Sequence, residues 1–248
     1  MGSLQGQNVV VVGGSRGVGR AIVETVLSEG ATVLAVARGT QPLQELSWEH
    51  PRVKILAADA TQDTAPDMVF AALQPDVLVI CAGALAPSAP VQDQSWEDFS
   101  ANWDMDVKAS FLFCKAALQG QLKPGSRVLL ISSGAALSGG PPNSGGYSGA
   151  KRMQMFLAAH CQKEADRLGL GLRFMALVPM RIMADTGVGQ AGISGVSAYL
   201  GISPADFLAS MTDVQTPADV GRAVVTLAGD RLQGVSFTVS GSGLAAAA

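Results

Sequence analysis

The sequence predicts a single α/β domain, 1–248, built on a doubly wound, mostly parallel sheet of seven strands with helices on both faces. Short apolar runs rich in β-branched residues alternate with longer amphipathic segments, which favours right-handed strand–helix–strand crossovers. The runs are almost continuously apolar, as in parallel strands that are buried on both faces. Apolar residues make up 48% of the chain and charged residues only 15%, so we also expect some surface to be covered in an oligomer.

The predicted elements follow this alternation along the chain. Seven apolar runs are predicted strands: 8–12, 32–37, 53–58, 76–81, 127–132, 172–178 and 235–239. Five segments are predicted helices: 17–28, 64–73, 96–118, 147–168 and 216–228. The last of these has a start signal, because Thr216 suits the N-cap and Pro217 the first helical position.

One region, 180–211, breaks the alternation by inserting about thirty residues between the sixth and seventh strands. It is rich in Gly, Ala, Ser and Met and carries few charges. It follows the carboxyl end of a strand, the side on which such sheets bind ligands, so we favour a lid over a substrate pocket. A disordered loop and an oligomer contact are the alternatives.

Composition excludes several classes of function. A net charge of −3 gives no basic footprint for nucleic acid, and no apolar run approaches the roughly 18–20 residues of a membrane helix. The N-terminus lacks the pattern of a signal peptide, and we expect a cytoplasmic protein whose three cysteines, Cys81, Cys114 and Cys161, are free thiols. The two histidines, His50 and His160, are far apart, and no metal site is predicted.

A glycine-rich turn, GGSRGVG, follows the first strand and opens a helix. Glycines let the backbone approach a pyrophosphate, whose charge the free amides and the helix dipole favour. The context is that of a dinucleotide-binding (Rossmann) fold, although a tight turn with no ligand would also need glycine. The predicted cofactor-binding residues of this turn are Gly13, Ser15, Arg16, Gly17, Val18 and Gly19.

The end of the second strand indicates which dinucleotide is bound. NAD-binding chains usually place an acidic residue there, but this chain has Ala37 followed by Arg38, and Arg16 could reach the same place. Guanidinium groups pair with phosphate through two parallel hydrogen bonds, so we favour NADP(H) over NAD(H). The alternative is that both arginines are merely solvated.

Further motifs appear in an order and spacing that resemble the short-chain dehydrogenase/reductase family from about residue 8 to 243. GGSRGVG resembles its glycine motif, and GVSFTVSGSG is similar to its last strand. The remaining matches are Asp59 and Ala60 at the adenine edge, Ala82 and Gly83 after the fourth strand, and Ser133, Tyr147 and Lys151 as the catalytic residues. The family is commonly tetrameric, which implies a homo-oligomer, a tetramer or a dimer.

The chemistry of these residues agrees with that resemblance. Tyr147 and Lys151 are four residues apart and so share one face of a helix, where the ammonium favours the ionised phenol. The hydroxyl of Ser133 can hold the substrate oxygen, although its neighbour Ser132 competes for this role. The resemblance implies that tyrosine is the acid or base, that lysine holds the nicotinamide ribose and that serine orients the substrate. Taken alone, the Tyr–Lys pair would indicate only a solvated helix face.

Several positions depart from the family pattern. Asp106 stands where an asparagine supports the proton relay to the lysine, and Ile80 and Cys81 replace two further asparagines. An aspartate keeps an acceptor but loses the amide donor, and if ionised it could hold the ammonium by charge. We include Asp106 among the catalytic residues, rather than Asn102 one turn away.

The segment after the sixth strand also departs from the family. It contains Pro179 and then Met180, with Ile182 at the place that contacts the nicotinamide and Ala184 where threonine is common. Pro179 and Ile182 are included among the cofactor-binding residues, and Thr186 could substitute through a two-residue shift.

Together these features predict an NADP(H)-dependent oxidoreductase that transfers a hydride between the nicotinamide and a ketone or secondary alcohol, with Tyr147 as the acid or base. The substrate would be an apolar or mixed small molecule beneath the 180–211 lid. The alternative is a cofactor-binding regulator or scaffold of the same fold without redox turnover. The sequence leaves open the identity of the substrate.

Overall fold

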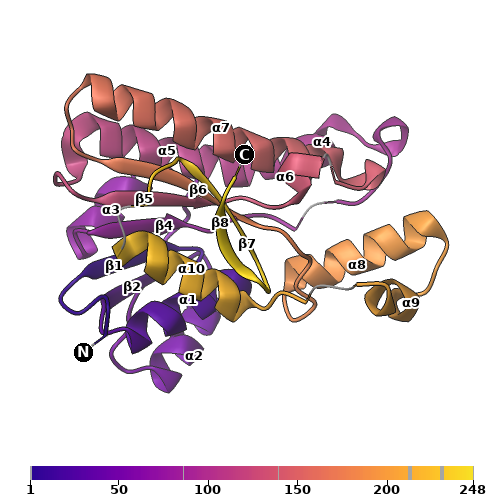
Figure 1. Ribbon diagram of the computed structural model, residues 1–248, viewed down its shortest axis with the longest axis horizontal. Coiled ribbons are helices and arrows are strands. Elements are labelled where there is room, and N and C mark those ends of the chain that lie inside the picture. Colours follow the sequence, from indigo (N-terminus) through magenta and orange to yellow (C-terminus); the bar gives the residue numbers. More distant parts are fainter. Residues whose placement is uncertain (1, 86, 139, 212–213, 230–231, 248) are drawn as a thin grey trace.

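The computed structural model describes residues 2–85, 87–138, 140–211, 214–229 and 232–247, and within them the chain forms one eight-stranded sheet in the order β3-β2-β1-β4-β5-β6-β7-β8 (Figure 1). The strands are β1 Asn8–Val12, β2 Thr32–Ala37, β3 Lys54–Ala57, β4 Val77–Ile80, β5 Arg127–Ile131, β6 Arg173–Pro179, β7 Ser236–Ser240 and β8 Gly243–Ala246. Strands β1 to β7 are parallel to one another, and β1 lies between β2 and β4, so the direction of winding reverses there. The predicted doubly wound α/β fold is confirmed.

The prediction of seven strands was wrong by one. β8 pairs antiparallel with β7 through a tight turn, with Ser240 opposite Gly243. Gly243 has a φ of +116°, which favours glycine. The strand lacks β-branched residues, and its alanines are extended because the edge of β7 offers them a partner.

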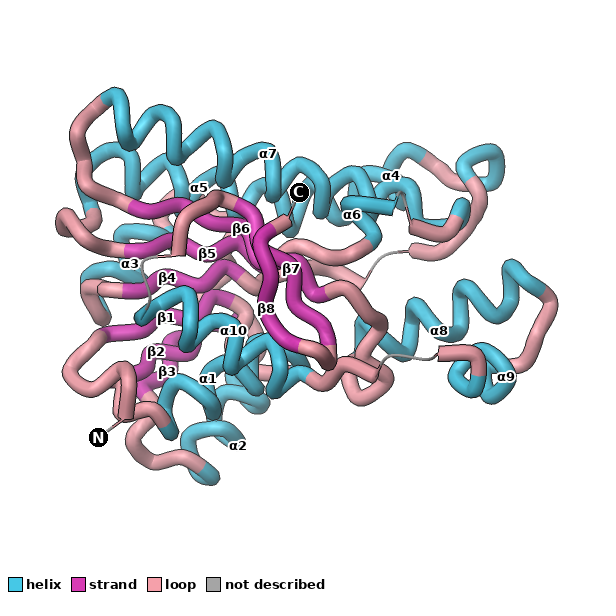
Figure 2. Tube along the Cα trace, in the orientation of Figure 1, coloured by secondary structure: helices cyan, strands magenta, loops and turns pink. Residues whose placement is uncertain are grey.

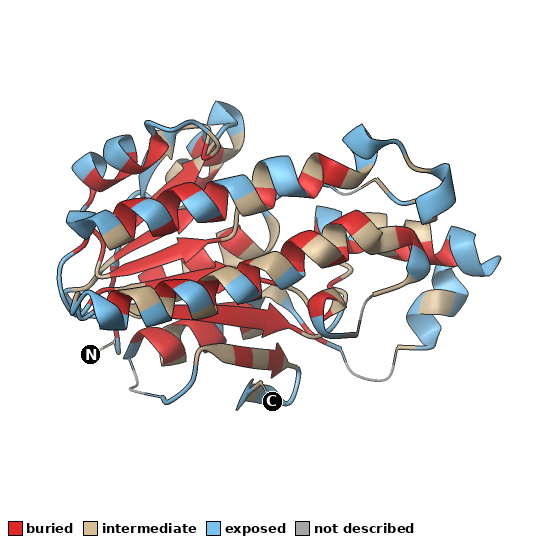
Figure 3. Cartoon of the chain, turned by 90° about the horizontal axis from the view of Figure 1, so that it is seen from above, coloured by how far each residue is buried: buried red, intermediate tan, exposed pale blue. Residues whose placement is uncertain are grey.

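The helices form two layers, one on each face of the sheet (Figures 1 and 3). The longer ones are α1 Gly17–Ser28, α2 Thr40–Glu49, α3 Ala65–Ala72, α4 Trp96–Asn102, α5 Lys108–Ala116, α7 Gly145–Arg167, α8 Gly187–Leu200 and α10 Pro217–Gly229, with the short α6 Ala135–Ser138 and α9 Pro204–Ala209. One core cluster joins the sheet to α3, α5 and α7, and the other joins it to α1, α2 and α10. Val10 and Val12 belong to the first cluster while Val9 and Val11 belong to the second, which is why the strands read as continuous apolar runs.

Two helices differ from their predicted form. The segment 96–118 is interrupted by a π-helical turn, Trp103–Val107, and a second one, Ala117–Gln121, extends it. The helix α2 was not predicted, because its sequence TQPLQELSWE is mostly polar. Its buried residues are Leu43 and Leu46. Tertiary contact rather than its own pattern specifies this helix.

The inserted region 180–211 is helical, which contradicts the disordered-loop alternative. It contains α8 and α9, which project beyond the carboxyl ends of the strands (Figures 1 and 2). Thr186 caps α8 by accepting a hydrogen bond from the amide of Gly189 at 2.9 Å. Halfway along α8, the carbonyl of Gly195 accepts a 2.8 Å hydrogen bond from Nδ2 of Asn143, just before α7, and the same Nδ2 donates to Oγ of Ser88.

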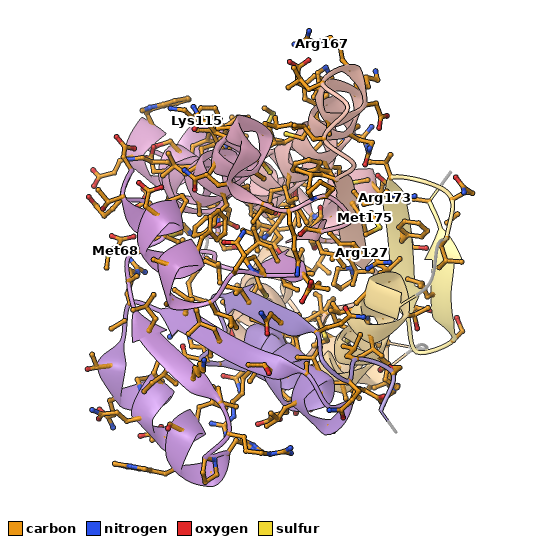
Figure 4. The ribbon with its side chains drawn as sticks, turned by 90° about the vertical axis from the view of Figure 1, so that its left-hand side faces the viewer. Met68, Lys115, Arg127, Arg167, Arg173 and Met175 are labelled. Atoms are coloured by element: carbon orange, nitrogen blue, oxygen red, sulfur yellow. The ribbon has the colours of Figure 1, made fainter. Side chains whose placement is uncertain are left out.

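The opposite end of the sheet, formed by the amino ends of the strands, is closed by polar contacts (Figure 4). Arg127 and Arg173 are register partners at the start of β5 and β6, and Arg173 donates to the carbonyls of Leu232 and Gly234.

In the part of the chain that the structure describes, no helix is long and apolar enough to span a membrane.

We expect Gly19→Ala to destabilise the fold although alanine favours a helix. The new Cβ would lie 2.0 Å from the carbonyl oxygen of Gly13, and this backbone clash exceeds the gain in helix propensity of about 1 kcal/mol. Urea unfolding monitored by circular dichroism should show a net loss of about 1–3 kcal/mol. Gly229→Ala, at the end of α10 with open space around it, is the matched control and should change stability by less than about 0.5 kcal/mol. Equal stability of the two variants would contradict the close approach.

Candidate active site

The predicted site residues gather at the carboxyl ends of the parallel strands, on the side where α1 and α7 begin (Figure 1). The sheet changes winding direction between β1 and β4. In open α/β sheets this switch point leaves a crevice between the outgoing loops, and ligands bind there. The fold therefore brings together three separate stretches of the sequence at one edge.

The glycine turn is packed too tightly for side chains. A Cβ on Gly13 would lie 2.5 Å from the amide nitrogen of Ala82, and Gly13 also has a φ of +88°. The amides of Gly13 and Gly14 donate to the carbonyl of Val36, which fixes the turn to β2. Arg16 is the N-cap residue of α1 and makes no capping bond with its side chain among the described contacts. The first amides of α1 are thus available to an anion, and the cradle fits the pyrophosphate of a dinucleotide.

The predicted phosphate-binding arginines lie at the rim of this cradle. Arg16 and Arg38 are both exposed, and Arg38 directly follows β2. Asp59, after β3, accepts hydrogen bonds from the amide and hydroxyl of Thr61 at 3.0 and 2.8 Å. These bonds, the amide first, lower the pKa of Asp59, and the charge of Arg38 acts in the same direction. Asp59 is therefore an ionised acceptor on the side of the cradle where Arg38 lies.

The start of α7 is pressed against α4 by two glycines. A Cβ on Gly146 would lie 2.2 Å from the carbonyl oxygen of Phe99, and one on Gly145 would touch the ring of Phe99. This approach places Tyr147 at the mouth of the site, half-buried, with Nζ of Lys151 5.8 Å from the centre of its ring. The predicted spacing on one helical face is confirmed.

Lys151 is buried, with an exposure of 7%, and its ammonium meets three acceptors of the protein. Nζ lies 3.0 Å from Oδ2 of Asp106, and donates to the carbonyl of Ile131 and to Oε1 of Gln154, both at 3.1 Å. Burial by itself lowers the pKa of Lys151, but the charges of Asp106 and Tyr147 oppose it and leave that pKa raised. The lysine is therefore a cation at neutral pH.

Asp106 lies in the π-helical turn and is 1% exposed. Its Oδ1 accepts hydrogen bonds from the amide of Ala84 at 2.9 Å and from Nδ2 of Asn102 at 3.3 Å. A Cβ on Gly83 would lie 3.0 Å from Oδ2, so a side chain there would press on the carboxylate. Asp106 thus joins the loop after β4 to Lys151. Such π-helical turns often occur at functional sites.

The two adjacent serines after β5 have different partners. Ser132 is buried and donates its hydroxyl to the carbonyl of Lys151 at 2.8 Å, which ties β5 to α7. Ser133 is half-buried, and its Oγ accepts a 3.3 Å bond from the amide of Ala135. The hydroxyl proton of Ser132 is therefore occupied, which favours Ser133 as the residue that orients a substrate.

Gln154 belongs to the same network, and the sequence reasoning missed it. It is fully buried, and its Nε2 donates to Oγ of Ser110 at 2.9 Å and to the carbonyl of Asp106 at 3.4 Å. Its position three residues after Lys151 on a helix was the signal that could have identified it. Cys81 lies on the other side, where burial raises the pKa of its thiol to about 11.

Thr186 lies closer to the glycine turn than its sequence position suggests. A Cβ on Gly17 would lie 3.6 Å from Cβ of Thr186, while Ile182 packs toward α8, 3.8 Å from the Cβ position of Gly192. The hydroxyl of Thr186 donates to the carbonyl of Met183 and accepts from the amide of Gly189. The start of the inserted region therefore lies beside the glycine turn. The described residues contain no cluster of three or more His, Cys, Asp or Glu side chains that could hold a metal.

Comparison with known proteins agrees with this arrangement. A sequence model of the short chain dehydrogenases matches residues 7–192. The 2,5-dichloro-2,5-cyclohexadiene-1,4-diol dehydrogenase of Sphingobium indicum is 31% identical over 72% of this chain and 74% of its own. Versicolorin reductase 1 of Dothistroma septosporum is 26% identical over 96% and 95% of the two chains.

The fold is likewise similar to a solved structure. A short chain dehydrogenase/reductase family protein superimposes with a TM-score of 0.75 at 23% identity, covering 96% of this chain and 97% of that one. The family match spans three quarters of the chain, including the glycine turn and the Tyr–Lys pair. The protein therefore belongs to the short-chain dehydrogenase/reductase family of oxidoreductases.

Proposed function

We propose that the protein transfers a hydride between NADP(H) and a ketone or secondary alcohol, with Tyr147 as the acid or base. The observation that carries this proposal is the Tyr147–Lys151 pair at the start of α7, beside the glycine cradle at the switch point of the sheet. The family uses a nicotinamide cofactor, and the cradle has the close glycines and open helix amides that a pyrophosphate needs.

The bound cofactor supplies or accepts the hydride, and the residues of the chain manage the proton and the position of the substrate. Ser133 donates a hydrogen bond to the substrate oxygen and holds it next to the phenol of Tyr147. In reduction the phenol gives its proton to that oxygen, and in oxidation the phenolate removes the proton from the alcohol. Gly13, Gly17 and Gly19 hold the pyrophosphate, and Asp59 and Ala60 face the adenine.

The preference for NADP(H) rests on charge at the rim of the cradle. Arg38 follows β2 at the position where an acidic residue would bind the ribose hydroxyls of NAD, and Arg16 lies in the turn opposite. Both guanidinium groups are exposed and can pair with a 2′-phosphate. Ala82, Gly83, Pro179 and Ile182 line the path from the cradle toward the nicotinamide.

The lid formed by 180–211 closes the substrate side. Its base touches the glycine turn through Thr186, and a Cβ on Gly187 would lie 3.9 Å from Leu85. Leu85 and Val188 are exposed apolar side chains at this entrance. An apolar or mixed carbonyl compound fits such a lining, in keeping with relatives named as a diol dehydrogenase and a reductase.

We also propose a cytoplasmic homo-oligomer, a dimer or a tetramer. The outer faces of α5 and α7 carry large exposed apolar side chains, including Phe111 and Phe156, which are 50% and 54% exposed. Contiguous apolar surface of this kind usually marks a contact between chains.

Tyr147→Phe should lower the rate of carbonyl reduction by about 10²-fold or more, because the phenol that donates the proton is lost. The binding of NADPH, measured by quenching of tryptophan fluorescence, should stay within about threefold of the unchanged protein, since a factor of three is under 1 kcal/mol. Tyr199→Phe, near the far end of α8, removes the other phenol of the chain and serves as the control. A rate that survives in Tyr147→Phe would rule out the acid–base role. Tight NADPH binding with no turnover of any ketone by the unchanged protein would instead support a regulator.

Arg38→Asp should weaken NADPH binding by about tenfold or more while NADH binding changes little, because a charged hydrogen bond to phosphate is worth about 1.5–3 kcal/mol. Titration calorimetry with both cofactors measures the ratio. Arg52→Asp makes the same change of charge at an exposed position before β3 and should leave the ratio unchanged. An unaltered preference in Arg38→Asp would remove the argument for the phosphate.

A further inference from the structure

The ammonium of Lys151 is surrounded by acceptors of the protein. An ammonium carries three N–H donors, and Nζ faces Asp106, Ile131 and Gln154 at 3.0–3.1 Å. The first of these partners is a carboxylate, and both members of the pair are buried. The cation next to Tyr147 is thus held in place and paired with an opposite charge.

The two oxygens of Asp106 face different groups. Oδ1 receives the amide of Ala84 and Nδ2 of Asn102, while Oδ2 faces Nζ of Lys151. An asparagine would have to present its NH₂ group to one of these donors. A carboxylate presents an oxygen to each side. Asp106 therefore holds the loop after β4 and also pairs with the ammonium of Lys151.

Asp106 and Lys151 are the main charges near the phenol of Tyr147, because the other ionisable groups around it are neutral or exposed. From β4, the thiol of Cys81 has a pKa of about 11 and is neutral at pH 7. On the far side of α7, Arg152 is exposed and donates to the carbonyl of Ala136. The remaining charged side chains on the neighbouring segments are exposed: Asp104 and Lys108 next to the π-helical turn, Glu97 and Asp98 on α4, and Arg181 and Asp185 before α8.

An unpaired ammonium next to a phenol favours the phenolate, whereas an ion pair of zero net charge favours it far less. We propose that Asp106 cancels the charge of Lys151 at the phenol of Tyr147, so that alcohol oxidation, which needs the phenolate, rises only at a higher pH than an unpaired lysine would allow. The inference rests on the proposed function of the Tyr147–Lys151 site. Asp106 is a positioning residue that acts through the lysine.

The proton balance follows from this assignment. In reduction the cofactor is oxidised by giving a hydride to the carbonyl carbon, the phenol of Tyr147 gives its proton to the carbonyl oxygen, and the phenolate regains a proton from water. A protonated phenol at neutral pH is ready for this step. Alcohol oxidation needs the phenolate first, and is therefore fast only at higher pH.

The test uses the fact that the chain has only two tyrosines. In a Tyr199→Phe background, the ultraviolet absorbance of phenolate reports Tyr147 alone, in apo-protein and without turnover. Adding Asp106→Asn should lower the pH midpoint of this titration by about 1 unit or more. Asp104→Asn removes an exposed carboxylate two residues away, which accepts only from Ser100 in the structure, and should leave the midpoint unchanged.

A double variant separates charge from damage to the fold. Asp106→Asn combined with Lys151→Met removes both charges, so the midpoint should rise again to within about 0.5 unit of the parent, as expected when the parent pair has no net charge. If Asp106→Asn alone does not fold, Lys151→Met is compared with the double variant. Lys151→Met leaves the carboxylate of Asp106 unpaired, so its removal in the double variant should lower the midpoint. A folded Asp106→Asn with an unmoved midpoint, or a double variant that keeps the low one, would overturn the proposal.

Turnover provides an independent readout. The pH midpoint of the alcohol oxidation rate should fall by about 1 unit in Asp106→Asn, in step with the titration of the phenol. A shifted titration in a protein that turns over no ketone would refute the proposed function and leave the role of Asp106 standing. Turnover of a ketone with an unshifted titration would support the proposed function and refute the role of Asp106.

Discussion

The buried ion pair between Asp106 and Lys151 joins the parts of the structure on which the site depends. Through it the π-helical turn, the loop after β4, the end of β5 and α7 share one polar network inside an otherwise apolar layer. Removing one partner of such a pair typically costs about 3–5 kcal/mol, because a buried charge is left alone. Loss of either partner would therefore remove a large part of the stability of a typical domain.

Close backbone contacts set the second constraint. Gly13 against Ala82, Gly19 against Gly13 and Gly146 against Phe99 each leave less space than a methyl group requires. These contacts bring the first strand and its helix, the fourth strand and the start of α7 to one edge of the sheet. The same absence of side chains exposes backbone amides, so the tight packing and the anion cradle have one physical cause.

The insertion after β6 is only loosely tied to the sheet. Its two helices make few contacts with the body of the protein, chiefly the Thr186 region beside the glycine turn and the Asn143 bonds to Gly195 and Ser88. Loops and short helices on a rigid sheet can change without disturbing the core. The insertion can therefore change while the network around Tyr147 and Lys151 stays in place.

The sequence by itself determined the sheet, because apolar runs and helical periodicity are local signals that the core then satisfies. It also identified the glycine turn, the Tyr147–Lys151 spacing and the position of Asp106. It did not predict α2, β8 or the helices of the insertion, whose residues have weak patterns and take their form from neighbours. Only the tertiary structure decided that the hydroxyl of Ser132 bonds to α7, that Gln154 completes the lysine network and that Thr186 lies beside Gly17. Those facts depend on which strands are adjacent, and adjacency in a doubly wound sheet does not follow the order of the chain.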